Sequence, residues 1–136
     1  MCGEGVIEIV RACLAGRAEI AFAYVHGSAL TASAPRDIDI AIVLREDAFA
    51  TFVRTGGLNL DYAIPLEIEL DHALGRKADV HVINRAPLAF RFRVVSQGVA
   101  VVDNDPDARA QFEYLSRCEY FDFCPRRREY LAGVTA

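Results

Sequence analysis

The chain has 136 residues, of which 53% are hydrophobic and 25% are charged, and its formal net charge is −4. This balance is typical of a globular protein and excludes a disordered chain, and the length predicts a single domain spanning residues 1–136. Because a net negative charge disfavours electrostatic attachment to DNA or RNA, we expect no direct nucleic-acid binding.

The cysteines and the apolar segments indicate the compartment. The four cysteines form no CxxC pair and have no zinc-ligand spacing with the histidines. No apolar run reaches the length of a membrane span, and the N-terminal residues lack the basic stretch of a signal peptide. We therefore expect a cytoplasmic protein that does not associate with membranes.

Hydrophobic periodicity and turn residues predict the secondary structure. In chain order we expect a helix (4–16), a strand (20–25), a strand (37–44), a weak helical segment (48–54), a helix (59–75), a strand (78–83), a helix (87–96), an edge strand (99–102) and a C-terminal helix or helix pair (106–131). Proline disrupts helices, so the helix at 59–75 should begin near Ile64, before Pro65, and the last helix should be interrupted at Pro125. The order predicts an α/β (α+β) fold, a small mixed sheet flanked by helices.

The most informative motif is Gly27-Ser28 followed, after a loop of eight residues, by Asp37-Ile38-Asp39. Side chains two apart on a strand point to one face, so Asp37 and Asp39 should project together. The small residues of the Gly-Ser turn allow backbone N–H groups to approach an anion. Two aspartates side by side repel each other unless a cation neutralises them. The motif therefore predicts metal-assisted phosphoryl chemistry.

Asp79 opens the strand predicted at 78–83. If that strand lies beside the strand of Asp37 and Asp39, all three carboxylates meet at one end of the sheet. Asp79 would then complete a two-metal site or act as general base toward an incoming hydroxyl. The alternative is a surface aspartate at the start of a strand.

The remaining polar groups receive no catalytic role. His81 shares the face of Asp79 and is interpreted as structural, and His26 is expected to point across the sheet. We interpret one set of polar residues as the solvated face of the helix at 59–75: Glu67, Glu69, Asp71 and His72.

Gly27-Ser28, Asp37-Ile38-Asp39-Ile40-Ala41 and the distal Asp79 together resemble the DNA polymerase β-like nucleotidyltransferase superfamily, most of all its minimal nucleotidyltransferase branch. Residues 78–87 are similar to the third-strand-to-helix passage of that branch, and residues 112–130 to its C-terminal helix. The resemblance covers nearly the whole chain.

This resemblance implies a polymerase β-like fold with Gly27 and Ser28 at the triphosphate of ATP. It implies that Asp37, Asp39 and Asp79 are the catalytic carboxylates and bind Mg²⁺. It further implies an antitoxin that transfers AMP from ATP to a hydroxyl, a tyrosine in our reading, of a HEPN-type ribonuclease toxin. The toxin would be encoded by a neighbouring gene and would form a hetero-oligomer with this chain.

Two alternatives remain open. The loop at 29–36 is shorter than is common in that branch, and Leu30-Thr31-Ala32 stands where Arg-Gly is usual. A binding-only antitoxin that blocks its toxin sterically with a degenerate nucleotide site would tolerate this change. Nucleotidyl transfer to a small molecule is the other alternative, although enzymes of that kind usually add a helical acceptor-binding domain for which this chain has no room.

Overall fold

The computed structural model describes residues 3–27 and 37–135, with side chains described for residues 5–27 and 37–122. The elements follow the chain in this order: α1 (Gly3–Leu14), β1 (Ile20–His26), β2 (Asp37–Leu44), α2 (Glu46–Thr55), the π-helix η2 (Leu58–Ala63), α3 (Ile64–Leu74), β3 (Lys77–Val82), α4 (Leu88–Gln97), β4 (Val99–Asp103) and α5 (Pro106–Thr135).

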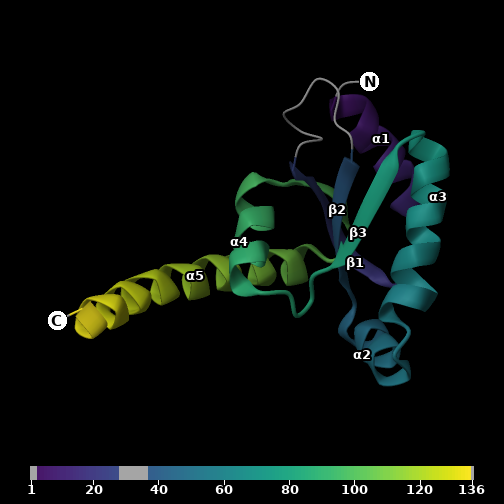
Figure 1. Ribbon diagram of the computed structural model, residues 1–136. Helices are drawn as coiled ribbons and strands as arrows, with labels where there is room; N and C mark the ends of the chain where they lie inside the picture. Colours follow the sequence, from purple (N-terminus) through teal and green to yellow (C-terminus); the bar gives the residue numbers. More distant parts are fainter. Residues whose placement is uncertain (1–2, 28–36, 136) are drawn as a thin grey trace.

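Three layers make up the fold (Figure 1). Within the described residues, a four-stranded sheet in the order β3-β2-β1-β4 forms the middle layer. Strand β1 is antiparallel to β2 and β4, whereas β2 and β3 are parallel. Helices α1 and α3 cover one face of the sheet, and α4 and α5 cover the other. The predicted fold class, a small mixed sheet flanked by helices, is confirmed.

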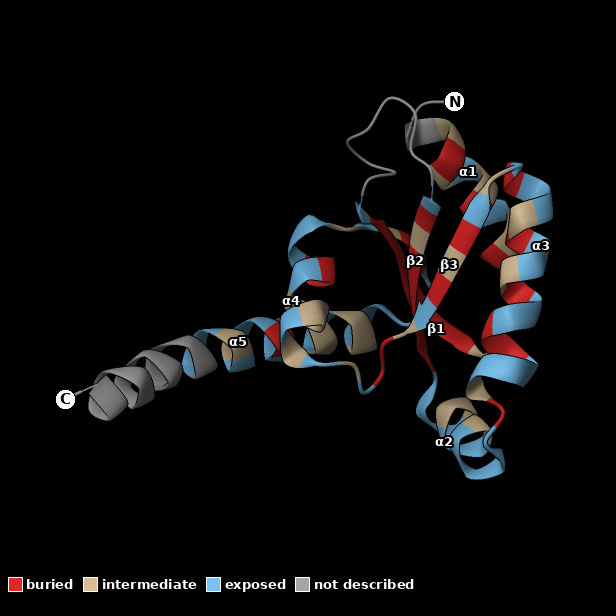
Figure 2. Cartoon of the chain, in the orientation of Figure 1, coloured by how far each residue is buried: buried red, intermediate tan, exposed pale blue. Residues whose placement is uncertain are grey.

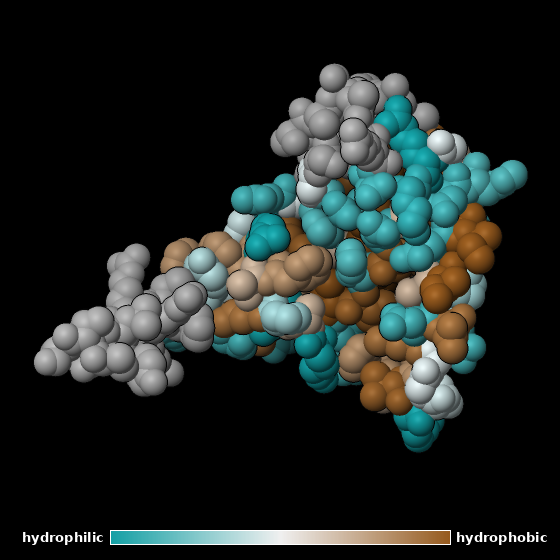
Figure 3. All heavy atoms as spheres, viewed as in Figure 1, coloured by the Kyte–Doolittle hydropathy of each residue, from teal (hydrophilic) through white to brown (hydrophobic). Residues whose placement is uncertain are grey.

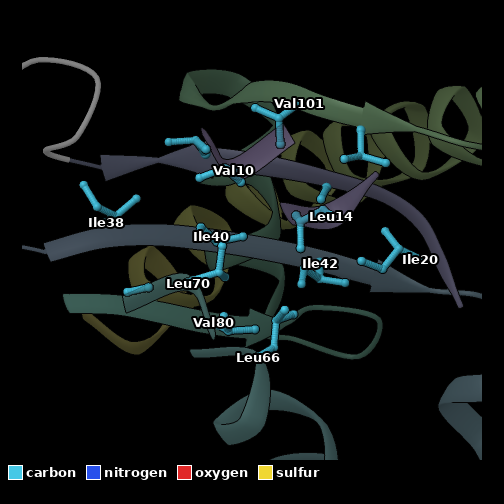
Figure 4. Close-up of a cluster of buried hydrophobic side chains, with 14 of the residues drawn as sticks. Val10, Leu14, Ile20, Ile38, Ile40, Ile42, Leu66, Leu70, Val80 and Val101 are labelled. Carbon is cyan, nitrogen blue, oxygen red and sulfur yellow. The ribbon is translucent and has the colours of Figure 1, made fainter. Parts of the chain in front are cut away.

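The central strands are buried because helices lie on both sides of them, as the red strands in Figure 2 show. On β2, Ile38, Ile40 and Ile42 turn toward α1 and α3, where the core of Figure 4 forms. Alternate residues point the other way, so Ala41 and Val43 pack toward α4 and α5. By the same alternation, Asp37 and Asp39 lie on the α4/α5 face.

The effect of Pro65 is as expected. Helix α3 begins at Ile64 with Pro65 in its first turn, and the π-helix η2 runs directly into it, with the N–H of Ile64 donating to the carbonyl oxygen of Asn59. The C-cap of α3 is Gly75, which has a positive φ of 66°.

The helix break predicted at Pro125 was wrong, because α5 continues without a break from Pro106 to Thr135. A proline removes a single backbone hydrogen bond, and the helical turns on either side of it remain.

The sequence suggested that the acidic side chains of α3 are only solvated, but two of them accept hydrogen bonds from backbone groups. Glu67 accepts a hydrogen bond from the backbone N–H of Val80 at 2.9 Å, and Asp71 accepts one from that of Ala78 at 2.6 Å. These N–H groups lie on the outer edge of β3, where another strand could otherwise pair with them. Glu67 and Asp71 therefore protect the edge of the sheet.

Helix α5 extends away from the sheet in Figure 1. Its first half is anchored through Glu113, which accepts a hydrogen bond from the Tyr24 hydroxyl of β1 at 2.8 Å. The rings of Phe22 and Phe112 also lie 5.4 Å apart. Among the helices that the structure describes, none is both long and apolar enough to cross a membrane.

Candidate functional site

The three predicted carboxylates meet at one end of the sheet, on the α4/α5 face. Asp37 is exposed and begins β2, and Asp39 follows it on the same face. Asp39 is the register partner of Asp79 in the parallel pair of β2 and β3. Register partners project to the same side of a sheet, so Asp79 lies beside Asp39. The condition that the sequence left open, that β3 lies beside β2, is therefore met.

Gly27 closes this end of the sheet immediately after β1. Its φ is +77°, a left-handed conformation that glycine adopts without strain. A Cβ atom at this position would overlap the Oδ2 atom of Asp39 and force that carboxylate to move, so glycine lets the backbone lie against it. Ser28 and the loop at 29–36 fall outside the described residues.

Lys77, the one lysine of the sequence, lies beside Asp79. Its Nζ atom is 3.6 Å from Asp79 Oδ1 and 3.8 Å from Glu67 Oε2. Desolvation opposes the charge of Lys77, but the carboxylates of Glu67, Asp71 and Asp79 raise its pKa overall. The sequence analysis missed this residue, although its position two before Asp79 on the same strand indicates that both side chains share a face.

His26 also belongs to this face, so the expectation that it points across the sheet was wrong. It is the register partner of Asp39 in the antiparallel pair of β1 and β2, and such partners project to the same side. The His26 ring lies 6.3 Å from that of His81 and 5.6 Å from that of Phe90.

The side chain of His26 is buried, and its Nε2 atom has no hydrogen-bond partner within the described residues. Burial lowers the pKa of His26, Asp39 acts against this shift, and the charges of His81 and Arg93 add to it. A neutral imidazole therefore forms part of the floor of the site.

Helix α4 forms a wall beside the carboxylates. The ring of Phe90 contacts both His26 and His81 edge to face, at 5.6 and 5.5 Å. Figure 3 shows hydrophilic residues gathered over the end of the sheet at which β2 and β3 begin. The site is thus an acidic surface on the strands, bordered by an aromatic side chain of a helix.

A cavity of about 680 Å³ lies near the opposite end of the sheet and is separate from this site. Its lining includes Leu44, Arg85, Asn104 and Phe112, and none of the three aspartates. Size alone does not identify the functional site here, because the cavity lacks the clustered carboxylates that metal-assisted chemistry requires.

The donor atoms of the site suit Mg²⁺, which prefers carboxylate oxygens. Within the described residues, however, no three His, Cys, Asp or Glu side chains are arranged to hold a metal ion by themselves. Mg²⁺ commonly binds through one or two carboxylates together with phosphate oxygens and water. The absence of a side chain at Gly27 lets the backbone at the end of β1 lie directly against the Asp39 carboxylate, so backbone and carboxylate could contact the same nucleotide. The site therefore fits Mg²⁺ that arrives with a nucleotide.

A known family matches most of the chain. Residues 8–107 match the model of the family described as polymerase beta, nucleotidyltransferase. Among curated protein sequences, none matches the chain.

Three similar solved structures are toxin–antitoxin complexes. The first, the tri-AMPylated Shewanella oneidensis HEPN toxin with MNT antitoxin, is 20% identical with a TM-score of 0.61 and covers 98% of this chain and 96% of the other. The second, MntA–HepT, is 19% identical with a TM-score of 0.61 and covers 98% and 97%. The third, a toxin–antitoxin complex with AMP-PNP, is 20% identical with a TM-score of 0.66 and covers 100% of both chains.

Identities at this level show a shared fold. The family match is more specific, since it spans most of the chain and includes Gly27, Asp37, Asp39 and Asp79. The chain belongs to the polymerase beta nucleotidyltransferase family.

Proposed function

We propose that this protein is a Mg²⁺-dependent adenylyltransferase that acts in the cytoplasm as an antitoxin. It transfers AMP from ATP to a hydroxyl of a HEPN-type toxin, with which it forms a hetero-oligomer. The observation that carries the chemistry is the register pairing of Asp39 with Asp79, beside Asp37 and against the backbone of Gly27.

Gly27 and Ser28 are the residues proposed to hold the triphosphate of ATP. The support for Gly27 is its bare backbone next to Asp39, whereas Ser28 is proposed from the sequence motif. Asp37 and Asp39 would hold Mg²⁺, with Asp79 available as a third ligand. When bound, Mg²⁺ would neutralise phosphate charge and orient the triphosphate.

The transfer is an in-line displacement at the α-phosphorus. A bond forms between the acceptor oxygen and the α-phosphorus, and the bond from that phosphorus to the bridging oxygen breaks. Pyrophosphate leaves with the electron pair, and the hydroxyl proton passes to a carboxylate. We propose that Asp79 is the carboxylate that accepts this proton, because it lies near the start of β3 beside Asp39. Catalysis then depends on positioning and charge neutralisation.

The choice of acceptor protein rests on the structural relatives. One of them is described as a complex with a tri-AMPylated HEPN toxin, and another as a toxin–antitoxin complex with AMP-PNP. On the sequence resemblance, we propose a tyrosine hydroxyl as the acceptor. The partner protein would present this hydroxyl to the carboxylates of β2 and β3.

A binding-only antitoxin is the second candidate. The shortened loop at 29–36, with Leu30-Thr31-Ala32 in place of the usual Arg-Gly, favours it. In this case the fold would still engage the toxin, and inhibition would need no nucleotide.

Mass spectrometry of the partner separates the two candidates. The purified protein is incubated with the product of its neighbouring toxin gene, ATP and Mg²⁺, and the intact mass of the partner is measured. Adenylyl transfer predicts a mass increase of one or more AMP groups, with none for the Asp39→Asn variant. An unchanged mass, while gel filtration shows that the complex forms, would contradict the transferase and support the binding-only antitoxin.

A further inference from the structure

We propose that Arg93 of α4 binds the phosphate groups of the nucleotide and so supplies the basic side of the site. This inference rests on the proposed function, because it assigns a further substrate-binding residue to the same site. Three observations support it: the position of Arg93 on the helix, its lack of a hydrogen-bond or ion-pair partner among the described residues, and the charge balance around the aspartates.

The position follows from the aromatic contacts of α4. Phe90 packs against His26 and His81, which lie on the face of Asp39 and Asp79. Residues three apart on a helix are neighbours on its surface, so Arg93 lies one turn from Phe90 on the same side.

The direction of α4 places that turn at the acidic end of the sheet. The helix starts after β3 has ended, and its C-cap is Gly98, where a Cβ atom would lie 3.4 Å from the carbonyl oxygen of Val25. Val25 is also the register partner of Val99 and precedes Gly27 by two residues. From Phe90 onward, α4 therefore runs toward Gly27 and Asp39. The charge of Arg93 is close enough to act on His26, the register partner of Asp39.

Among the described residues, Arg93 has no partner that would give it a structural role. It is exposed, and it makes no hydrogen bond or ion pair with another residue in the part of the chain that the structure describes. Arg91, two residues earlier, shows the contrast. Its side chain donates to the carbonyl oxygen of Ala86 at 3.0 Å and pairs with Glu119 at 3.3 Å. Arg91 therefore holds α4 to its surroundings, whereas Arg93 is available for a ligand.

The charge balance explains why such a residue is needed. The strands contribute three carboxylates to the site, and the nearby Lys77 already pairs with Asp79 and Glu67. In the loop at 29–36, the segment Leu30-Thr31-Ala32 contains no basic residue, and Arg36, the single basic residue of the loop, lies outside the described residues. A guanidinium binds phosphate oxygens through two parallel hydrogen bonds, which suits Arg93 to the triphosphate.

The test compares Arg93→Gln with Arg54→Gln. Arg54 is an exposed arginine of α2, which lies at the opposite end of the sheet (Figure 1). Both variants therefore remove one positive charge, but from opposite ends of the sheet. Binding of AMP-PNP is measured by calorimetry with Mg²⁺ present, and thermal unfolding is measured without nucleotide.

We expect Arg93→Gln to weaken AMP-PNP binding by about 10-fold to 100-fold, the loss typical of one charged hydrogen-bonding group. Its unfolding midpoint should remain that of the wild type, Arg93→Lys should recover part of the affinity, and Arg54→Gln should bind normally. If the wild type binds AMP-PNP and Arg93→Gln binds it as tightly as Arg54→Gln, the role of Arg93 is overturned alone. If the wild type itself binds no AMP-PNP, the nucleotide site of the proposed function fails with it.

Discussion

Asp39 of β2 and Asp79 of β3 are register partners in a parallel pair of strands, so two carboxylates far apart in the sequence project side by side. Asp37 shares their face at the start of β2, and Gly27 brings the end of β1 against Asp39. Adjacent like charges are unfavourable unless a cation binds. The fold therefore holds an arrangement that binding of Mg²⁺ with a nucleotide would stabilise.

Replacing Asp39 with asparagine tests this relationship. We expect Asp39→Asn to reduce AMP transfer by about 100-fold or more, because it removes a negative charge that would hold Mg²⁺. Without metal, the variant should be as stable as the wild type or more stable by up to about 1 kcal/mol, since a repulsive cross-strand pair is lost. Transfer assays and urea unfolding measure the two effects. Asp107→Asn, in an exposed position of α5, is the control, and transfer by Asp39→Asn at the wild-type rate would show that the wrong carboxylates have been assigned.

Gly27→Ala should separate backbone strain from interference with the site. Gly27 and Gly56 both have a positive φ, of 77° and 73°, but only at Gly27 would a Cβ atom overlap Asp39. Each substitution should lower the free energy of unfolding by about 1–2 kcal/mol, because an alanine is strained in this conformation. Only Gly27→Ala should also lose AMP-PNP affinity, measured by calorimetry. Equal affinities for the two variants would mean that phosphate does not approach Gly27.

The raised pKa of Tyr62 predicts that the folded state loses stability at alkaline pH. Burial and the hydrogen bond that its hydroxyl donates to Glu19, 2.9 Å long, raise the pKa of Tyr62 above its ordinary value of 10.0. The folded state then holds the proton more tightly than the unfolded state. This stabilisation is complete below the unfolded pKa and is lost as the pH rises above it.

Urea unfolding of wild type and Tyr62→Phe at neutral pH and at about pH 11 checks this effect. At neutral pH the variant should be less stable by about 1–2 kcal/mol, because the bond to Glu19 is lost. The difference should shrink at the higher pH, while Tyr24, whose pKa is also raised by burial and by Glu113, keeps some alkaline sensitivity in both proteins. A difference that does not change with pH would contradict the prediction.

Asn84 should matter for stability and not for chemistry. Its buried side-chain amide accepts from the Leu44 N–H at 2.9 Å and donates to the Leu44 carbonyl at 2.8 Å, at the end of β2 away from Asp37. Asn84→Ala leaves both backbone groups without these partners, so the free energy of unfolding should fall by about 2–3 kcal/mol. Asn59→Ala, in an exposed position of η2, should change it by less than about 0.5 kcal/mol. Transfer per folded molecule should be unchanged, and a large loss there would extend the functional site to this end of the sheet.

The positions of most elements could be predicted from the sequence, because short-range patterns determine them. The alternating aliphatic residues of β2, the proline at the start of α3 and the glycine after it are local signals that tertiary contacts did not override. The helix break predicted at Pro125 was wrong because it rested on a local signal alone, a single residue in a helix of thirty. The roles of Glu67 and Asp71 could not be predicted, because their partners are backbone groups of another element.

By itself, the sequence determined the pair Asp37 and Asp39 and the glycine that precedes them, since strand alternation alone puts both carboxylates on one face. Only the tertiary structure decided that β3 pairs with β2 rather than elsewhere, which brings Asp79 to Asp39. It also decided that His26 belongs to this face and that α4 places Phe90 beside it. Strand order and helix docking depend on contacts across the whole core, and no local pattern of residues encodes them.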